Sequence, residues 1–332
     1  MRSKTERGKI SIGLVGAGPV WDQRYRQVVT GLSDRIVVAA VFDSVLSRAQ
    51  HVAAELNAEA VGGLTALFER SSVQGVLILD PAWFGAFPLR LGFRFNKPVF
   101  LAESPRCELE LLQSLERESQ DTGATIMVEF ARRHEPATNR LRELMATRLG
   151  PARRIEIDVP ARSLQGASGT ELFTGCSQLE PWLDWSGYVA GWSPQQIQVG
   201  RFSCESAADN PRETRTVTVT FGRKGASQQQ ATAVLRLQPE PHVPLRRTVD
   251  CDHGHAELLG EDRIAWQNGA AAGDEHLGSE KTAAEVTLQQ FCRRIAGGLV
   301  PVAGLSDVAR GLRLAAAVRA SEQQGTAVSI EP

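Results

Sequence analysis

The sequence predicts an α/β fold in two domains: a doubly wound parallel sheet, then a smaller α/β domain with a largely antiparallel open sheet. In the first 130 residues, short continuous apolar runs alternate with helical stretches, as in parallel sheets whose strands are buried on both faces. After Pro136, strand patterns follow one another without helices between them, which is typical of an antiparallel sheet. We expect domains at 1–131 and 132–332.

The first domain contains apolar runs that are too short for helices and lack polar alternation. The stretches between them have helical periodicity, so each helix connects two parallel strands by a right-handed crossover. We expect strands at 10–15, 36–42, 73–79, 99–102 and 125–128, and helices at 47–56, 84–95 and 108–122.

The second domain begins with a helix at 137–149 that ends at Gly150-Pro151, a helix stop signal. Two segments rich in Gly, Ser and Ala, 163–175 and 269–278, are expected to be mobile loops. We expect strands at 155–159, 196–201, 214–221, 232–237, 247–251, 263–266 and 327–330, and helices at 282–296 and 307–322.

The composition excludes several classes of protein. The net charge of −1 argues against a nucleic-acid or anionic membrane partner, and no apolar run is long enough to span a membrane. The five cysteines are scattered and no secretory signal is present, so we expect reduced thiols in a cytoplasmic protein. Cys251, His253 and His255 alternate as metal ligands can, but we interpret them as part of a hairpin and expect no metal site.

A glycine-rich loop follows the first predicted strand. Gly16 and Gly18 allow a tight turn and a close approach of the backbone to a pyrophosphate, and Pro19 and Val20 open the next helix. Trp21 stands where such loops carry a small residue, so we expect a distorted loop. The alternative is a tight turn that binds no ligand.

Asp43 ends the second predicted strand, where a carboxylate binds the adenosine ribose of a dinucleotide. Its charge would repel a 2′-phosphate and favour NAD, although Ser44 and Arg48 could also admit NADP. The alternative role of Asp43 is to cap the helix that follows.

Several further segments resemble the glucose-fructose oxidoreductase/inositol dehydrogenase/MocA family over nearly the whole chain. Residues 76–81 resemble its fourth strand and turn, 96–105 its G-K-x-V-x-x-E-K-P segment, and 128–136 its G-F-x-x-R-F-x-P joint between domains. Residues 291–321 are similar to its closing helix, G-x-x-P turn and helix.

The resemblance implies a Rossmann domain, a nicotinamide cofactor, a sugar- or polyol-like ligand and a homo-oligomer formed through the C-terminal sheet. It places Gly16 and Gly18 under the pyrophosphate and Glu103 near the nicotinamide ribose. It also places Asp80 and Pro81 along the edge of the cofactor.

The family's proton-transfer residues are missing. Ser104 stands at the position of the E-K-P lysine, and a neutral serine cannot supply a cationic hydrogen bond. The family's Asp-x-x-x-His pair aligns with Asp184 and Tyr188, or, with fewer gaps, with Ser177 and Pro181. Neither alignment preserves the histidine.

We therefore expect an NAD(P)-dependent oxidoreductase homologue with a degenerate catalytic site and weak or no turnover, in which cofactor binding itself could be weakened. Arg132 and Asp184 are the candidate substrate ligands. One alternative is an active dehydrogenase with a rearranged site that uses Asp184, Tyr188 and Arg106. The other is a non-catalytic ligand-binding or scaffold protein. Trp83 and Phe84 either pack in the core or as an apolar wall, or they fill space that a nicotinamide would need.

Overall fold

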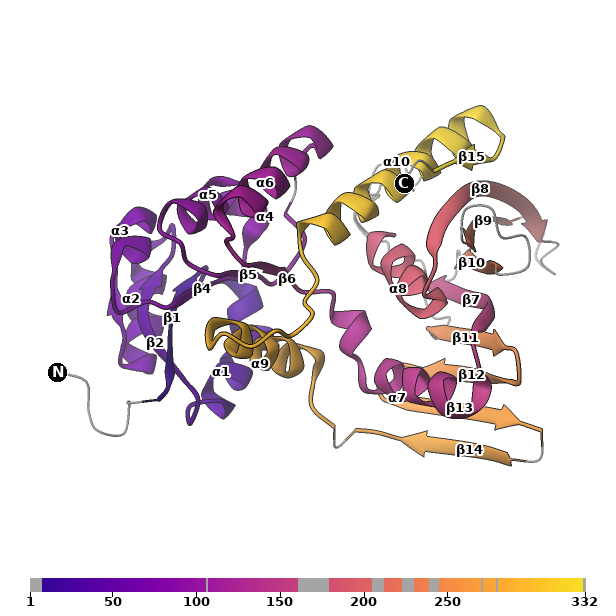
Figure 1. Ribbon diagram of the computed structural model, residues 1–332, viewed down its shortest axis with the longest axis horizontal. Coiled ribbons are helices and arrows are strands. Elements are labelled where there is room, and N and C mark those ends of the chain that lie inside the picture. Colours follow the sequence, from indigo (N-terminus) through magenta and orange to yellow (C-terminus); the bar gives the residue numbers. More distant parts are fainter. Residues whose placement is uncertain are drawn as a thin grey trace. The chain divides into compact units, whose positions relative to one another are not determined.

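The computed structural model describes residues 8–105, 107–160, 179–204, 212–222, 230–238, 245–269, 271–278 and 280–330. The chain forms two compact units (Figure 1). The first comprises Met1–Ala131 and Ala284–Ala309, and the second comprises Arg132–Ala283 and Arg310–Pro332. The chain leaves the first unit after Ala131 and returns to it for residues 284–309.

The first unit is built on a six-stranded parallel sheet in the order β3-β2-β1-β4-β5-β6. This confirms the predicted doubly wound fold. The central strands are almost fully buried, which explains their continuous apolar sequences. The strands are β1 (Ile10–Val15), β2 (Ile36–Phe42), β3 (Glu59–Ala60), β4 (Gly75–Ile78), β5 (Val99–Leu101) and β6 (Ile126–Val128).

Helices cover both faces of this sheet. The helix expected at 84–95 is two helices, because Gly85 adopts a φ of +59° and its N–H bonds back to the Pro81 carbonyl. The helices are α1 (Arg26–Gly31), α2 (Leu46–Leu56), α3 (Leu64–Glu69), α4 (Pro81–Phe84), α5 (Phe87–Arg94), α6 (Leu109–Thr122) and α9 (Ala283–Ile295).

Helix α9 brings the returning segment into the core of the first unit. Phe291 packs against Phe100 of β5 with tilted rings, 5.5 Å between ring centres. A Cβ on Gly75 would lie 2.6 Å from the Ile295 side chain, so α9 approaches β4 as closely as a glycine allows.

Trp21 is fully buried in the core beneath the glycine-rich loop. The chain there forms a π-helical turn (Trp21–Tyr25) before α1, so the wide turn accommodates the large indole. The expected distortion therefore lies in the helix that follows the loop.

The second unit is built on a nine-stranded sheet in the order β14-β13-β12-β11-β7-β10-β9-β8-β15. Its neighbouring strands are antiparallel except β7 and β10, as predicted for a largely antiparallel sheet. The strands are β7 (Ala152–Pro160), β8 (Ser193–Cys204), β9 (Arg212–Gly222), β10 (Gln230–Gln238), β11 (Arg246–Cys251), β12 (Gly254–Leu259), β13 (Arg263–Asn268), β14 (Ala271–His276) and β15 (Val328–Ser329).

Helices of the second unit pack against this sheet. α7 (Pro136–Leu144) continues into a π-helical turn (Met145–Leu149), and α8 (Glu180–Ala190) was not expected from the sequence. α10 (Leu305–Gln324) begins in the first unit and continues into the second. Trp182, Trp185 and Leu183 of α8 are buried in the core of the second unit.

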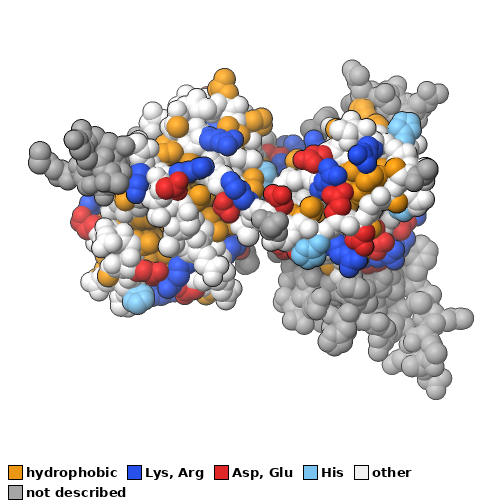
Figure 2. All heavy atoms as spheres, turned by 90° about the horizontal axis from the view of Figure 1, so that it is seen from below, with side chains coloured by type: hydrophobic (Ala, Val, Ile, Leu, Met, Phe, Trp, Pro, Cys, Tyr) orange, Lys and Arg blue, Asp and Glu red, His pale blue; other side chains and the backbone are white. Residues whose placement is uncertain are grey.

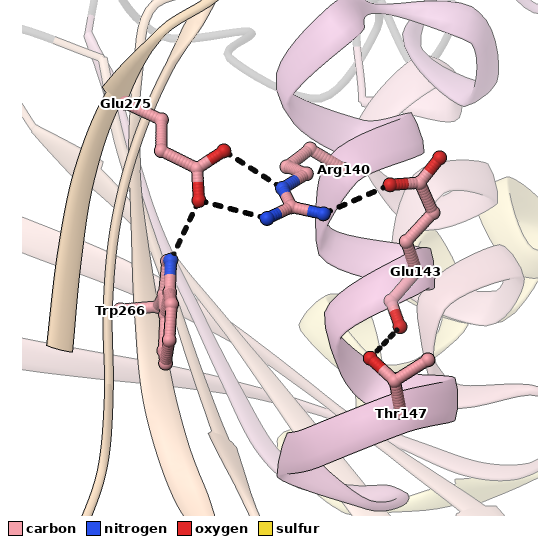
Figure 3. Close-up of polar contacts among 5 residues, drawn as sticks. All are labelled: Arg140, Glu143, Thr147, Trp266 and Glu275. Carbon is pink, nitrogen blue, oxygen red and sulfur yellow. Dashed lines mark hydrogen bonds and ion pairs between the residues drawn. The ribbon is translucent and has the colours of Figure 1, made fainter. Parts of the chain in front are cut away.

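The expectation of a loop at 269–278 was wrong, because Ala271–His276 forms β14. The strand pairs with β13, and Arg140 of α7 donates two hydrogen bonds to Glu275, at 2.7 and 3.0 Å (Figure 3). The indole N–H of Trp266 donates to the same carboxylate at 2.8 Å. These contacts hold a strand whose own side chains supply little apolar burial.

The surface carries both signs of charge. On the face in Figure 2, Lys and Arg side chains are interspersed with Asp and Glu and form no single-sign field. This distribution fits the net charge of −1. In the described part of the chain, no helix is long and apolar enough to cross a lipid bilayer.

Candidate cofactor and substrate sites

The predicted dinucleotide residues follow the carboxyl ends of β1, β2, β4 and β5, where ligands bind in open parallel sheets. Gly16 has a φ of +92°, and a Cβ there would lie 3.3 Å from the backbone nitrogen of Asp80. The loop after β1 therefore packs directly on the turn after β4. Pro19 is exposed and Val20 is half-buried at the start of the following helix.

Asp43 ties the glycine-rich loop to the end of β2. Its Oδ2 accepts the Ala17 N–H at 2.7 Å, and its Oδ1 accepts the Val45 N–H at 2.7 Å. The Arg48 Nε lies 3.3 Å from Oδ1, and only 5% of the Asp43 side chain is exposed. The carboxylate thus holds the turn before α2, although it does not bond an N–H inside that helix.

The loop leaves room for a phosphate. A Cβ on Gly18 would meet one atom within 4 Å, the Arg48 Nη1 at 3.5 Å, and Trp21 points into the core. Open backbone and a nearby guanidinium are the donors that a pyrophosphate needs, so the residues present fit a dinucleotide.

The remaining predicted cofactor residues follow β2, β4 and β5. Asp80 is exposed, Pro81 is buried at the start of α4, and Ser44 is exposed after β2. Glu103 is exposed and Ser104 half-buried after β5. Arg106 lies outside the described residues.

The two aromatic residues after Pro81 differ in their surroundings. Trp83 is 71% exposed, so it does not pack in the core, and an apolar wall stays a prediction. Phe84 packs on Phe42 at the end of β2, with ring centres 5.9 Å apart. These aromatic residues form an apolar edge next to the loop.

Sequence reasoning missed a buried charged cluster in the first unit. Glu129, just after β6, is fully buried and lies 2.5 Å from the Arg24 guanidinium. Tyr25 donates a short hydrogen bond to the other Glu129 oxygen, and Thr287 of α9 donates to the carboxylate at 3.3 Å. Burial raises the pKa of Glu129, and burial together with Glu129 raises the pKa of Tyr25 well above its usual value.

The charged position of Glu129 between apolar neighbours was a usable signal, because a buried carboxylate needs partners. Its partners could not be identified, since Tyr25 is 104 residues away in the chain. Arg24 also lies within electrostatic range of Glu103.

The second unit contains a cavity of about 340 Å³ beside α8. Asp184 and Tyr188 of α8 both line it, with Arg133, Trp192, Ser193 and Arg310. Arg133 grips the Asp184 carboxylate with two hydrogen bonds, at 2.8 and 2.5 Å. The two candidate catalytic residues thus share one cavity.

Two guanidinium groups lie near the Tyr188 ring. The guanidinium carbons of Arg142 and Arg133 are 4.6 and 5.3 Å from the ring centre. Arg142 also donates a hydrogen bond to the Tyr188 carbonyl at 2.8 Å. No feature of the sequence indicated that these arginines lie beside Tyr188. Ser177, the alternative partner in the second alignment, lies outside the described residues.

Arg132 has different contacts from its neighbour Arg133. Its guanidinium lies 3.4 Å above the centre of the Trp182 ring and 3.3 Å from Glu135. Glu135 also pairs with the fully buried Arg247 at 2.5 Å. Arg132 does not line the cavity of the second unit, whose lining cations are Arg133 and Arg310.

Cys251 is the last residue of β11, His253 lies in the turn after it, and His255 is on β12. The three residues thus belong to the expected hairpin. Burial raises the pKa of the Cys251 thiol to about 12. Among the described residues, no group of three or more His, Cys, Asp or Glu side chains could hold a metal ion.

The chain has one unit with a parallel sheet and one with an open mixed sheet, and this two-domain fold occurs in solved structures of oxidoreductases. No protein-family model and no curated protein matches the sequence. Solved structures match over nearly the full length. A UDP-N-acetylglucosamine 3-dehydrogenase from Acidithiobacillus ferrooxidans has a TM-score of 0.73 at 18% identity, over 94% of this chain and 97% of its own.

Two further structures have the same fold. An NAD-binding oxidoreductase from Klebsiella pneumoniae gives a TM-score of 0.75 at 16% identity, covering 98% of this chain and 100% of its own. An aldose-aldose oxidoreductase from Caulobacter crescentus gives 0.76 at 14% identity, covering 97% and 100%. The fold is therefore that of the glucose-fructose oxidoreductase/inositol dehydrogenase/MocA type, which confirms the resemblance at the level of structure.

His134 gives the second unit a pH dependence. Burial, aided by the neighbouring Arg133 charge, lowers its pKa to about 4. The folded state therefore binds fewer protons than the unfolded state between pH ~6.5 and 4. We expect this residue to contribute a loss of stability of up to about 1.4 kcal/mol per pH unit as the pH falls through that range.

Urea unfolding at a series of pH values measures this slope. We expect His134→Gln to flatten the acid side of the profile, whereas His51→Gln, at an exposed position, leaves it unchanged. An equally steep acid profile in His134→Gln contradicts the assignment.

Proposed function

We propose that this chain is an NAD(P)-dependent oxidoreductase homologue that binds a sugar- or polyol-like ligand and has a degenerate catalytic site. The observation that carries the proposal is the loop after β1. Gly16 packs on the turn after β4, Ala17 is bonded to Asp43, and Gly18 remains open beneath Arg48. A tight turn without a ligand would not need an open glycine beside a guanidinium.

The bound cofactor would supply the hydride chemistry. The chain's own residues would bind and orient it. The backbone at Gly16 and Gly18 would face the pyrophosphate, and Asp43 and Ser44 would lie at the adenosine ribose. Asp80, Pro81 and Glu103 would line the nicotinamide half of the crevice.

The cofactor preference rests on Asp43 and Arg48. The sequence favoured NAD because a free carboxylate repels a 2′-phosphate. In the structure, the Asp43 oxygens accept two backbone N–H groups and face Arg48, whose side chain is 46% exposed. We therefore propose that the site accepts both NAD(H) and NADP(H).

The cavity of the second unit is the proposed ligand site. Tyr188 and Trp192 offer aromatic surface, and Asp184, Arg133 and Ser193 offer polar groups. A sugar or polyol has apolar C–H faces and many hydroxyls, and this combination complements such a lining. Two of the solved structures with this fold are named for enzymes that act on sugars or sugar nucleotides.

We propose weak or no turnover. Ser104 stands at the position of the family's lysine, and Asp184 is tied to Arg133. A guanidinium has too high a pKa to serve as a base. One alternative is an active dehydrogenase with a rearranged site that uses Tyr188, Asp184 and Arg106. A second alternative is a non-catalytic ligand-binding or scaffold role. By analogy with the family, the chain would be a cytoplasmic homo-oligomer assembled through the C-terminal sheet.

Cofactor binding is the first prediction from this proposal. Calorimetric titration should show saturable binding of both NAD(H) and NADP(H). We expect Gly18→Val to weaken both by about tenfold or more, about 1.4 kcal/mol, because the new side chain occupies the phosphate position. Gly62→Val is the matched control, since a Cβ there meets nothing within 4 Å. Absence of any binding by the unmodified chain refutes the proposed function.

Cofactor preference is the second prediction. Arg48→Gln removes the cation beside Asp43 and should weaken NADP(H) about tenfold more than NAD(H), since only the former carries a 2′-phosphate. The control is Arg90→Gln, an exposed arginine that pairs with Glu118 at 3.8 Å. Equal losses for both cofactors contradict a role for Arg48 in phosphate recognition.

Turnover is the third prediction. Mixtures of the protein, cofactor and a panel of sugars and polyols should show little or no change in the absorbance of reduced nicotinamide. If slow turnover is found, Tyr188→Phe and Asp184→Ala should abolish it. Rapid turnover that survives both substitutions contradicts a degenerate site and also excludes the rearranged one.

A further inference from the structure

The first unit has a second cavity, of about 300 Å³, between the end of α6, the start of β6 and the segment after α9. Thr125, which lines it, directly precedes β6, whereas Gly16 and Asp43 follow their strands. All strands of a parallel sheet run in the same direction, so a residue that precedes its strand and residues that follow theirs lie at opposite ends of the strands. The cavity is therefore separate from the proposed dinucleotide crevice.

One charged side chain in this cavity has unused hydrogen-bond donors. Arg294 of α9 donates to the Gly298 carbonyl at 3.4 Å and to the Thr125 hydroxyl at 3.5 Å, both long contacts. Its Nε is buried and has no hydrogen-bond partner within the described ranges. A guanidinium carries five N–H donors in a planar fork that matches a carboxylate.

A charge of opposite sign lines the same cavity. Glu116 of α6 is half-buried, and no ion pair joins it to Arg294 or to another side chain in the part of the chain that the structure describes. Ile126, Val302 and Leu305 add apolar surface between the polar groups. The lining thus combines a cation, an anion and an apolar wall.

We propose that this cavity binds a small zwitterion, an α-amino acid with an apolar side chain. Its carboxylate would pair with Arg294 and Thr125, its ammonium group with Glu116, and its side chain would contact Leu305 and Val302. Glu116 would repel a simple anion, and Arg294 would repel a simple cation. The volume lies at the lower end of the range for small-molecule sites.

Calorimetric titration of the full chain with L-leucine, L-valine and L-phenylalanine tests the proposal, with acetate and butylamine as separate halves of the ligand. We expect saturable binding of at least one amino acid and none of the halves. Arg294→Gln and Glu116→Gln should each weaken it about tenfold or more. Arg293→Gln and Glu110→Gln, at exposed positions on the same two helices, should leave it unchanged.

Three results overturn the proposal. If no amino acid gives a heat of binding, the proposed site does not exist. If acetate binds and Glu116→Gln does not weaken its binding, the cavity is a simple anion site. Binding lost in Gly18→Val but kept in Arg294→Gln assigns the amino acid to the dinucleotide crevice. Thermal unfolding of each variant separates loss of binding from loss of fold, and because no cofactor is present, the outcome is independent of the proposed function.

Discussion

The buried carboxylate of Asp43 is the constraint on which the candidate cofactor site depends. Its two oxygens accept N–H groups from the loop after β1 and from the turn before α2, so two separate segments are held at one point. Arg48 then balances the charge and lies over the glycine-rich loop. A carboxylate with so little exposed surface must be satisfied by its own chain. These hydrogen bonds within the chain therefore set the shape of the crevice without a ligand.

A second buried carboxylate joins the returning segment 284–309 to the rest of the first unit. Glu129 follows β6, Tyr25 and Arg24 come from the turn after the glycine-rich loop, and Thr287 comes from α9. Removing any partner would leave a buried charge less well compensated, which is costly. The returning segment 284–309 is consequently part of the first unit's polar core as well as of its apolar packing.

Local signals predicted much of this fold and few of the long-range contacts. The buried strands of the first unit were predictable because their apolar runs are continuous, and this also placed Asp43 at the end of the second strand. Strand β14 was not, since Ala-Ala-Gly-Asp-Glu-His lacks apolar alternation and Arg140 lies 135 residues from Glu275. Helix α8 is buried on most of its surface, so it has no amphipathic stripe to recognise.

The charges near the candidate sites have a common arrangement. Arg24 is paired with the fully buried Glu129, Arg133 with Asp184, and Arg48 with Asp43. An arginine fixed by a carboxylate can orient a ligand or balance its charge, but it does not exchange a proton near neutral pH. Proton transfer needs a group whose pKa lies near the working pH, and Ser104 in place of a lysine provides none. Paired guanidinium groups of this kind favour binding over catalysis, which is the physical basis for proposing a retained cofactor frame with little or no chemistry.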